Sequence, residues 1–120
     1  MNISKITLKF AVKMVIEFDD ENLEELYKEG KTKSKNNKYR FQKSIIKQYK
    51  KTIDKLYGAN TLSTLYKIQS LNYEQLKGDL KEYESVRVND KYRIIFKSRT
   101  EGTETIMLIC KIFELSKHYE

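Results

Sequence analysis

The chain has 120 residues, of which 39% are apolar and 34% are charged, and its formal net charge is +7. This length supports one domain, residues 1–120, with a single core, and the composition is that of a soluble globular protein. No apolar run approaches the ~20 residues of a membrane span and no signal-peptide pattern opens the chain, so we expect no membrane partner.

Residues 8–18 alternate between apolar and other side chains, which is the period of a strand with one buried face. The apolar members are Leu8, Phe10, Val12, Met14, Ile16 and Phe18. Asp19 and Asp20 then offer oxygens for a helix N-cap, and Gly30 ends a short helix. The polar segment 31–37 has no apolar period and is predicted to be an exposed loop.

A longer helix is predicted over residues 39–57, because apolar residues recur there at helical spacing and Gly58 follows. Residues 31–57 carry a local charge of +9, since Asp54 is their one acid, whereas the other 93 residues sum to −2. The ten cations are Lys31, Lys33, Lys35, Lys38, Arg40, Lys43, Lys47, Lys50, Lys51 and Lys55. Such a segregated patch favours nucleic acid, the ribosome or an acidic protein segment as partner. The alternative is a solvated helix face without a partner.

Residues 62–68 predict one or two further helical turns. Residues 84–88 and 91–97 have the pattern of two strands, and Asn89-Asp90 supplies the turn between them. Tyr92, Ile94 and Phe96 are expected on one face of the second strand, with Lys91, Arg93, Ile95 and Lys97 on the other.

A further apolar strand is predicted over residues 105–113, after a turn at residues 100–102. Cys110 lies in this run and is the one cysteine, so it is predicted to be a buried thiol without a disulfide, as suits a reducing cytoplasm. The order of elements predicts an α+β fold in which the N-terminal strand and the helices pack on a twisted antiparallel sheet.

The polar residues Glu74, Lys77, Arg87 and Arg93 are separated by turns and by alternating apolar positions. An antiparallel sheet can bring all four to one surface, and His118 joins them if the last strand lies alongside. A carboxylate, several cations and a histidine suit the cutting of a phosphodiester. Three of these residues also have a structural alternative. Glu74 caps the turn near Asn72 or pairs with Lys77, Arg93 pairs with Glu84, and His118 is a terminal residue without a role.

Four segments carry a resemblance to a known family: LKGD at residues 76–79, Tyr83, VRVNDKYRIIF at residues 86–96, and the ending His118-Tyr119. Their order and spacing resemble toxins of the RelE/ParE superfamily, in particular its HigB-like branch of plasmid maintenance killers. The resemblance implies a RelE-like microbial RNase fold and a type II toxin that acts as a ribosome-dependent mRNA interferase in the cytoplasm. It also implies a cognate antitoxin, expected to be a helix-turn-helix DNA-binding protein.

The resemblance extends to individual residues. Glu74 matches the family's general base, and Arg93 matches the strand arginine that contacts the scissile phosphate. His118 and Tyr119 match the terminal catalytic residues, with His118 as the expected general acid. The residues expected to bind RNA or phosphate are Lys77, Arg87, Lys91 and Lys117. The chain departs from the pattern at its end, where Glu120 is additional and a short turn over residues 114–117 would displace His118.

Cleavage by the 2′-hydroxyl of RNA requires a base, an acid for the leaving 5′-oxygen, and cations for the charge that develops on phosphate. Glu74, His118 and the pair of Arg87 with Arg93 fill these roles, and the product is a 2′,3′-cyclic phosphate. No metal and no cofactor are expected. Two other functions compete: a non-enzymatic ParE-like toxin that poisons DNA gyrase, and a basic RNA- or ribosome-binding module that creates no new RNA ends.

Overall fold

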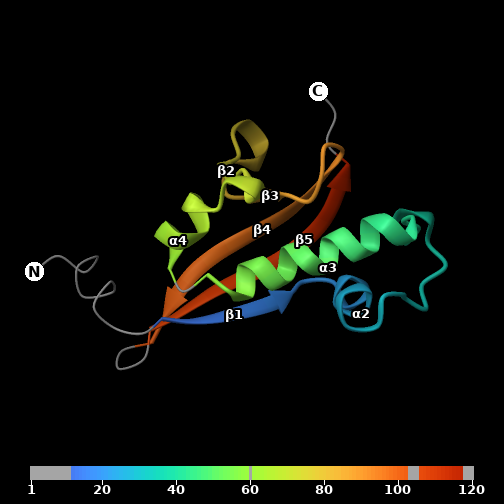
Figure 1. The fold of residues 1–120 in the computed structure, drawn as a ribbon, viewed down its shortest axis with the longest axis horizontal. Coiled ribbons are helices and arrows are strands. Elements are labelled where there is room, and N and C mark those ends of the chain that lie inside the picture. Colours follow the sequence, from blue (N-terminus) through green and yellow to red (C-terminus); the bar gives the residue numbers. More distant parts are fainter. Residues whose placement is uncertain (1–11, 60, 103–105, 118–120) are drawn as a thin grey trace, which may run out of the picture.

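The structure, a computed structural model, describes residues 12–59, 61–102 and 106–117. Figure 1 shows helices lying along a sheet whose long strands β4 and β5 run side by side. The elements are β1 (Val12–Phe18), α2 (Glu21–Glu29), a 3₁₀ helix (Asn37–Tyr39), α3 (Lys43–Tyr57), α4 (Leu62–Lys67), a 3₁₀ helix (Gln69–Leu71), β2 (Glu74–Gln75), a 3₁₀ helix (Gly78–Leu80), β3 (Glu84–Arg87), β4 (Tyr92–Glu101) and β5 (Ile106–Lys117). The predicted α+β class is confirmed.

The described strands form one sheet in the order β1-β5-β4-β3-β2. The pairs β2–β3, β3–β4 and β4–β5 are antiparallel, as predicted. Strand β1 instead pairs with β5 in parallel, from Val12 opposite Ile106 to Phe18 opposite Ile112. A parallel pair requires a long crossover connection, and the helices between β1 and β5 provide it. The expected strand residues 8–11 lie outside the described part of the chain.

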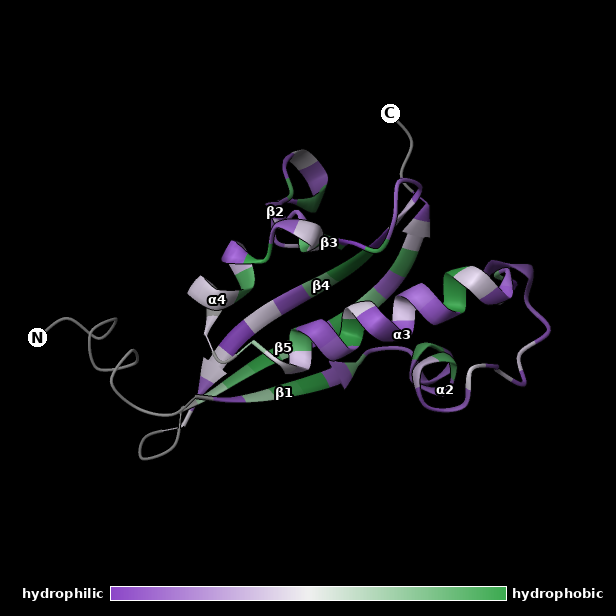
Figure 2. Ribbon diagram, in the orientation of Figure 1, coloured by the Kyte–Doolittle hydropathy of each residue, from purple (hydrophilic) through white to green (hydrophobic). Residues whose placement is uncertain are grey.

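The core lies between α3 and one face of the sheet. Tyr49, Ile53 and Leu56 of α3 are fully buried with Ile94 and Phe96 of β4. Figure 2 shows hydrophobic segments along β1 and β5, and alternating hydrophobic and hydrophilic turns along α3. Burying one such large side chain contributes about 1.5–3 kcal/mol, so these contacts hold α3 against this face of the sheet.

Both predicted ends of α2, the start after Asp20 and the stop at Gly30, are confirmed. The Asp20 side chain accepts a hydrogen bond from the backbone N–H of Asn22 at 2.9 Å, and Gly30 adopts φ 75°, the left-handed conformation that ends helices. The longer helix α3 begins at Lys43, four residues later than predicted. Phe41 lies before the helix, and its ring packs edge-on against Tyr92 with ring centroids 5.8 Å apart.

Strand β5 is longer than predicted and corrects one expectation. It continues through residues 114–117, where a turn was expected, because Leu115 is buried opposite Ile94 and Lys117 pairs with Tyr92. A bulge interrupts the register: Ile95 faces Glu114 but Phe96 faces Ile112, which leaves Phe113 as the extra residue. The pairing of β5 with β4 therefore extends to Lys117, while its last buried residue is Leu115.

Cys110 is fully buried in β5, as predicted, and desolvation, aided by the nearby Glu84 carboxylate, raises the pKa of its thiol to about 12. We expect the native protein to react with a thiol reagent at neutral pH at least about a thousandfold more slowly than the unfolded chain, because the thiolate is the reactive form. Stopped labelling followed by mass spectrometry, with and without concentrated guanidinium chloride, measures this ratio. Equal rates in the two conditions would contradict the buried placement.

Candidate active site on the open face of the sheet

The register of three strands, β2, β3 and β4, places the candidate polar residues on one side of the sheet. Glu74 of β2 lies opposite Ser85 of β3, and Arg87 of β3 lies opposite Arg93 of β4. Residues directly opposite each other in antiparallel strands share a face. This is the face away from Ile94 and α3, and it is called the open face below.

Arg93 is the centre of the cluster. Its Nη1 atom donates a hydrogen bond to Ser85 Oγ at 2.9 Å and lies 3.3 Å from Glu74 Oε2. The Arg93 side chain is 12% exposed and that of Glu74 is 50% exposed. The guanidinium is thus held by two partners against the sheet, while the carboxylate reaches toward solvent.

Ser85 is the member of this cluster that sequence reasoning missed. It is fully buried, and its hydroxyl oxygen accepts the Arg93 hydrogen bond. The signal available in the sequence was its position two residues before Arg87 on the same strand, which places both side chains on one face. A serine between apolar strand residues is too common a pattern to indicate this contact.

Glu84, the other candidate partner of Arg93, belongs to a separate buried network on the helix side. Its carboxylate accepts hydrogen bonds from the Tyr73 hydroxyl at 2.7 Å and from the backbone N–H and hydroxyl of Ser98 at 2.8 Å and 2.7 Å. Desolvation and the contact with Glu84 raise the pKa of Tyr73. The structure therefore pairs Arg93 with Glu74 and assigns Glu84 a structural position.

The predicted phosphate-binding residues fall in different places. Lys77 is exposed and, together with Glu74, lines an open cleft of about 540 Å³. Arg87 lies opposite Arg93 and forms an ion pair with Asp90. Lys91 is exposed at the β3–β4 turn. Lys117 lies opposite Tyr92 in the strand register. Because Tyr92 is two residues before the core residue Ile94, the position of Lys117 belongs to the helix side of the sheet.

His118 and Tyr119 lie outside the described residues. The described chain ends at Lys117, and the residue before it, Ser116, lies opposite Arg93. The described end of β5 thus reaches the level of Arg93 in the sheet. The catalytic roles of the two terminal residues stay predictions.

Other cations of the open face are also paired with carboxylates. Lys97 lies 3.5 Å from Glu82, and Arg99 contacts Glu17 and Glu101, each at 3.1 Å. Next to them Tyr83 and Phe113 meet edge to face with centroids 5.3 Å apart, and the Lys97 ammonium lies 4.5 Å above the Tyr83 ring. Both rings are half-buried, and accessible ring surface beside cations is where single-stranded bases commonly stack. The bulge places the half-buried Phe113 beside Tyr83, which no sequence pattern indicated.

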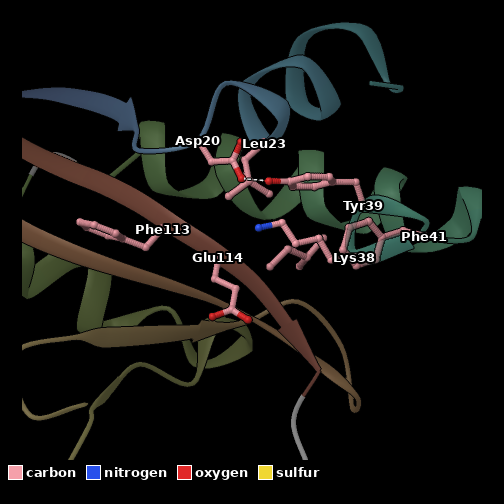
Figure 3. Close-up of a pocket in the computed structure, with 8 residues that line it drawn as sticks. Asp20, Leu23, Lys38, Tyr39, Phe41, Phe113 and Glu114 are labelled. Atoms are coloured by element: carbon pink, nitrogen blue, oxygen red, sulfur yellow. Dashed lines mark hydrogen bonds between the residues drawn. The ribbon is translucent and has the colours of Figure 1, made fainter. Parts of the chain in front are cut away.

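A second hollow of about 300 Å³ lies beside β5, between the start of α2 and the 3₁₀ helix at Asn37–Tyr39. Figure 3 shows the Lys38 amine pointing between Asp20 and Glu114, and the hydrogen bond from Tyr39 to Asp20. Partial burial acts to raise the pKa of Asp20, but hydrogen bonds from Tyr39 and Asn22 outweigh it and leave the pKa below its ordinary value. The Asp20 charge therefore stabilises the N-terminus of α2.

In the part of the chain that the structure describes, no three histidine, cysteine, aspartate or glutamate residues lie together in a way that could hold a metal ion. Within the same residues, no helix is both long and apolar enough to span a bilayer. The chemistry of the described cluster is that of a carboxylate and a fixed guanidinium on an accessible surface.

A family profile described as the RelE-like toxin of the type II toxin-antitoxin system HigB matches residues 16–108, most of the chain. The chain belongs to this HigB-like toxin family. The matched residues run from β1 into β5 and contain Glu74, Ser85 and Arg93 of the cluster. The toxin thus carries the Glu74–Arg93 contact within the part that defines the family.

Three solved structures are similar to the toxin. A YoeB/ParE toxin from Agrobacterium tumefaciens has 16% identity and a TM-score of 0.49, over 88% of this chain and 100% of that one. A YoeB-YefM complex from Staphylococcus aureus has 23% identity and a TM-score of 0.44, over 88% and 98%. A YoeB dimer from Staphylococcus aureus has 20% identity and a TM-score of 0.44, over 89% and 99%. A comparison with curated proteins found no similar sequence.

Proposed function

We propose that the toxin is an endoribonuclease that cleaves mRNA on the ribosome and uses the open face of its sheet as the active site. The observation that carries this proposal is the 3.3 Å contact between Glu74 and Arg93, which holds a half-exposed carboxylate beside a fixed guanidinium. Membership of the HigB-like toxin family supports the same activity. A carboxylate and a guanidinium at this separation can contact neighbouring groups of one RNA linkage, namely the ribose 2′-hydroxyl and a non-bridging oxygen of the phosphate that follows it.

In the proposed mechanism Glu74 accepts the proton of the 2′-hydroxyl as that oxygen attacks phosphorus. Arg93 stabilises the negative charge that develops on the non-bridging oxygens, and it needs little reorganisation because Ser85 already fixes it. His118 donates a proton to the leaving 5′-oxygen, and Tyr119 is proposed as a further catalytic residue. The products are a 2′,3′-cyclic phosphate and a free 5′-hydroxyl, and each role is filled by a side chain of the toxin without a metal.

Arg87 and Lys77 supply further positive charge at the edges of this site. Arg87 lies in the row of Arg93, and its ion pair with Asp90 can exchange for a phosphate because the Asp90 side chain is highly exposed. Lys77 extends the cleft at Glu74. Lys91 and Lys117 are proposed to contact more distant phosphates. We further propose that a cognate antitoxin with a helix-turn-helix fold inhibits the toxin in the cytoplasm.

The proposal is tested by mapping RNA ends after brief expression of the toxin and of Glu74→Gln in a bacterial host, with and without an inhibitor of translation. We expect new ends inside translated frames with the wild-type toxin. We expect at least a hundredfold fewer with Glu74→Gln, because glutamine cannot accept the proton. Blocking translation should remove the wild-type ends, and chelator should not alter cleavage by the purified toxin on ribosomes.

Glu101→Gln is the matched control for this experiment. Glu101 is also about half exposed and also pairs with an arginine, Arg99, at 3.1 Å, but it lies far along β4 from Arg93. We expect Glu101→Gln to cleave as the wild type does. Growth arrest with intact mRNA in every strain would contradict the proposal and favour a non-enzymatic toxin of the gyrase-poisoning type.

A further inference from the structure

The cations of the open face and those of α3 differ in how they are neutralised. The open-face cations that form ion pairs with carboxylates are Arg87, Arg93, Lys97, Arg99 and Lys111. On α3, the side chains of four lysines form no ion pair or hydrogen bond with any described residue: Lys43, Lys47, Lys50 and Lys51. Four cations without a carboxylate partner among the described residues therefore lie close together on this one helix.

These four residues, called the lysine stripe below, share one side of α3. Their spacing of four, seven and eight residues from Lys43 places them within about 100° of the helix surface and along about 12 Å of its axis. They line a shallow groove of about 380 Å³ with Ile46 and Asp54. The Asp54 carboxylate accepts a hydrogen bond from the Tyr27 hydroxyl at 2.5 Å and forms no ion pair with the stripe.

The stripe lies on the opposite side of the molecule from the Glu74–Arg93 cluster. Tyr49 and Ile53, on the other side of α3, are buried against the sheet face that carries Ile94, whereas Arg93 is on the open face. Figure 1 shows α3 running along this covered face. An RNA segment bound at Arg93 would have to pass around the whole sheet to reach Lys47, so the stripe is not part of the contact made by Arg93.

We propose that the lysine stripe of α3 binds the phosphate backbone of ribosomal RNA and so docks the toxin on the ribosome while the open face acts on mRNA. The ribosome is named as the source of this RNA because the proposed function places the toxin there, so the inference rests on that function. Closely spaced, unpaired ammonium groups suit phosphates, and displacement of counterions from RNA drives such binding. A protein partner would use aromatic or arginine anchors, but the groove offers only Ile46 as a large apolar side chain.

The test compares two variants of equal net charge in the non-cleaving Glu74→Gln background. In the first, the four lysines of the stripe are changed to glutamine. In the second, the matched control, four exposed lysines from other elements are changed to glutamine: Lys13, Lys28, Lys67 and Lys81. Cosedimentation with purified 70S ribosomes over a range of salt concentrations gives the affinity and its salt dependence, and thermal melts verify that both variants fold.

We expect the stripe variant to bind ribosomes about a hundredfold more weakly at low salt and to lose about three units from the slope of log K against log salt, because four phosphate contacts are removed. The control variant should change affinity by less than about threefold. Equal weakening by both variants would overturn the proposal, since net charge alone would then explain binding. Unchanged ribosome binding with lost binding to polyglutamate would also overturn it, in favour of an acidic protein partner.

Cleavage is measured separately, with Glu74 intact, so that failure of the proposed nuclease activity is distinguishable. The stripe variant should need a far higher ribosome concentration to reach half-maximal cleavage, with an unchanged rate at saturation, because α3 is remote from Arg93. If the wild type does not cleave mRNA at all, the proposed function fails while the binding comparison still decides the inference about the stripe. A fall in the saturated rate with unchanged affinity would overturn a docking role.

Discussion

Replacing Arg93 by alanine lowers the rate of RNA cleavage on ribosomes about a hundredfold to a thousandfold, the expected loss for one preorganised group that stabilises transition-state charge. Arg93 qualifies as such a group because Ser85 and Glu74 hold its guanidinium and only 12% of the side chain is exposed. Arg93→Lys should recover little activity. The lysine ammonium cannot contact Ser85, Glu74 and a phosphate with the fixed planar geometry of a guanidinium. Single-turnover cleavage of a ribosome-bound message measures the chemical step.

Arg99→Ala is the control for this prediction, because Arg99 also pairs with carboxylates on the open face but lies six residues along β4. We expect Arg99→Ala to retain nearly wild-type cleavage. Arg93→Ala also leaves the buried Ser85 hydroxyl without its partner, at a cost of about 1–3 kcal/mol in unfolding free energy. Rates should therefore be compared at a temperature where both variants are folded. Full activity of folded Arg93→Ala would reject the proposed role.

Replacing Glu84 by alanine should lower the free energy of unfolding by about 2–4 kcal/mol, because this change leaves the Tyr73 hydroxyl and the Ser98 N–H without an acceptor inside the protein. Glu84→Gln should cost less, since one carbonyl oxygen remains to accept a hydrogen bond. Denaturant unfolding followed by circular dichroism gives these differences. Cleavage by the folded Glu84→Ala protein should be near that of the wild type, because Glu84 faces the helix side of the sheet.

Glu82→Ala provides the comparison for Glu84. Glu82 also pairs with a cation, Lys97 at 3.5 Å, but its side chain is 72% exposed. An exposed ion pair of this kind contributes about 0–1 kcal/mol, so we expect a change within that range. A loss for Glu84→Ala no larger than that for Glu82→Ala would mean that the buried network does not stabilise the sheet.

Local patterns predicted most of the secondary structure because their causes are local. Asp20 and Gly30 mark the ends of α2 by capping chemistry, and the apolar spacing of Tyr49, Ile53 and Leu56 specifies which side of α3 is buried. The alternation around Arg93 correctly placed it on the face opposite Ile94. These features depend on residues within one or two turns of each other, so neighbouring side chains suffice to specify them.

The segment at the end of β5 shows where local patterns failed. Residues 114–117 have little strand character of their own, and they extend β5 because β4 offers a partner for each of them, with Leu115 buried against the core. The bulge opposite Ile95 and Phe96, which places Phe113 beside Tyr83, likewise depends on the fit of two strands. Register between strands is a property of the pair, and neither strand contains it alone.

The candidate site divides in the same way. The amino-acid sequence alone determined that Glu74 and Arg93 occur on strands of one sheet, that Cys110 is buried and that positive charge gathers near α3. The tertiary structure decided that Glu74, and not Glu84, is the partner of Arg93, and that Ser85 holds the guanidinium. Two carboxylates ten residues apart are equivalent in composition, and only the pleat of β2 and β3 turns one toward the open face and the other into the core.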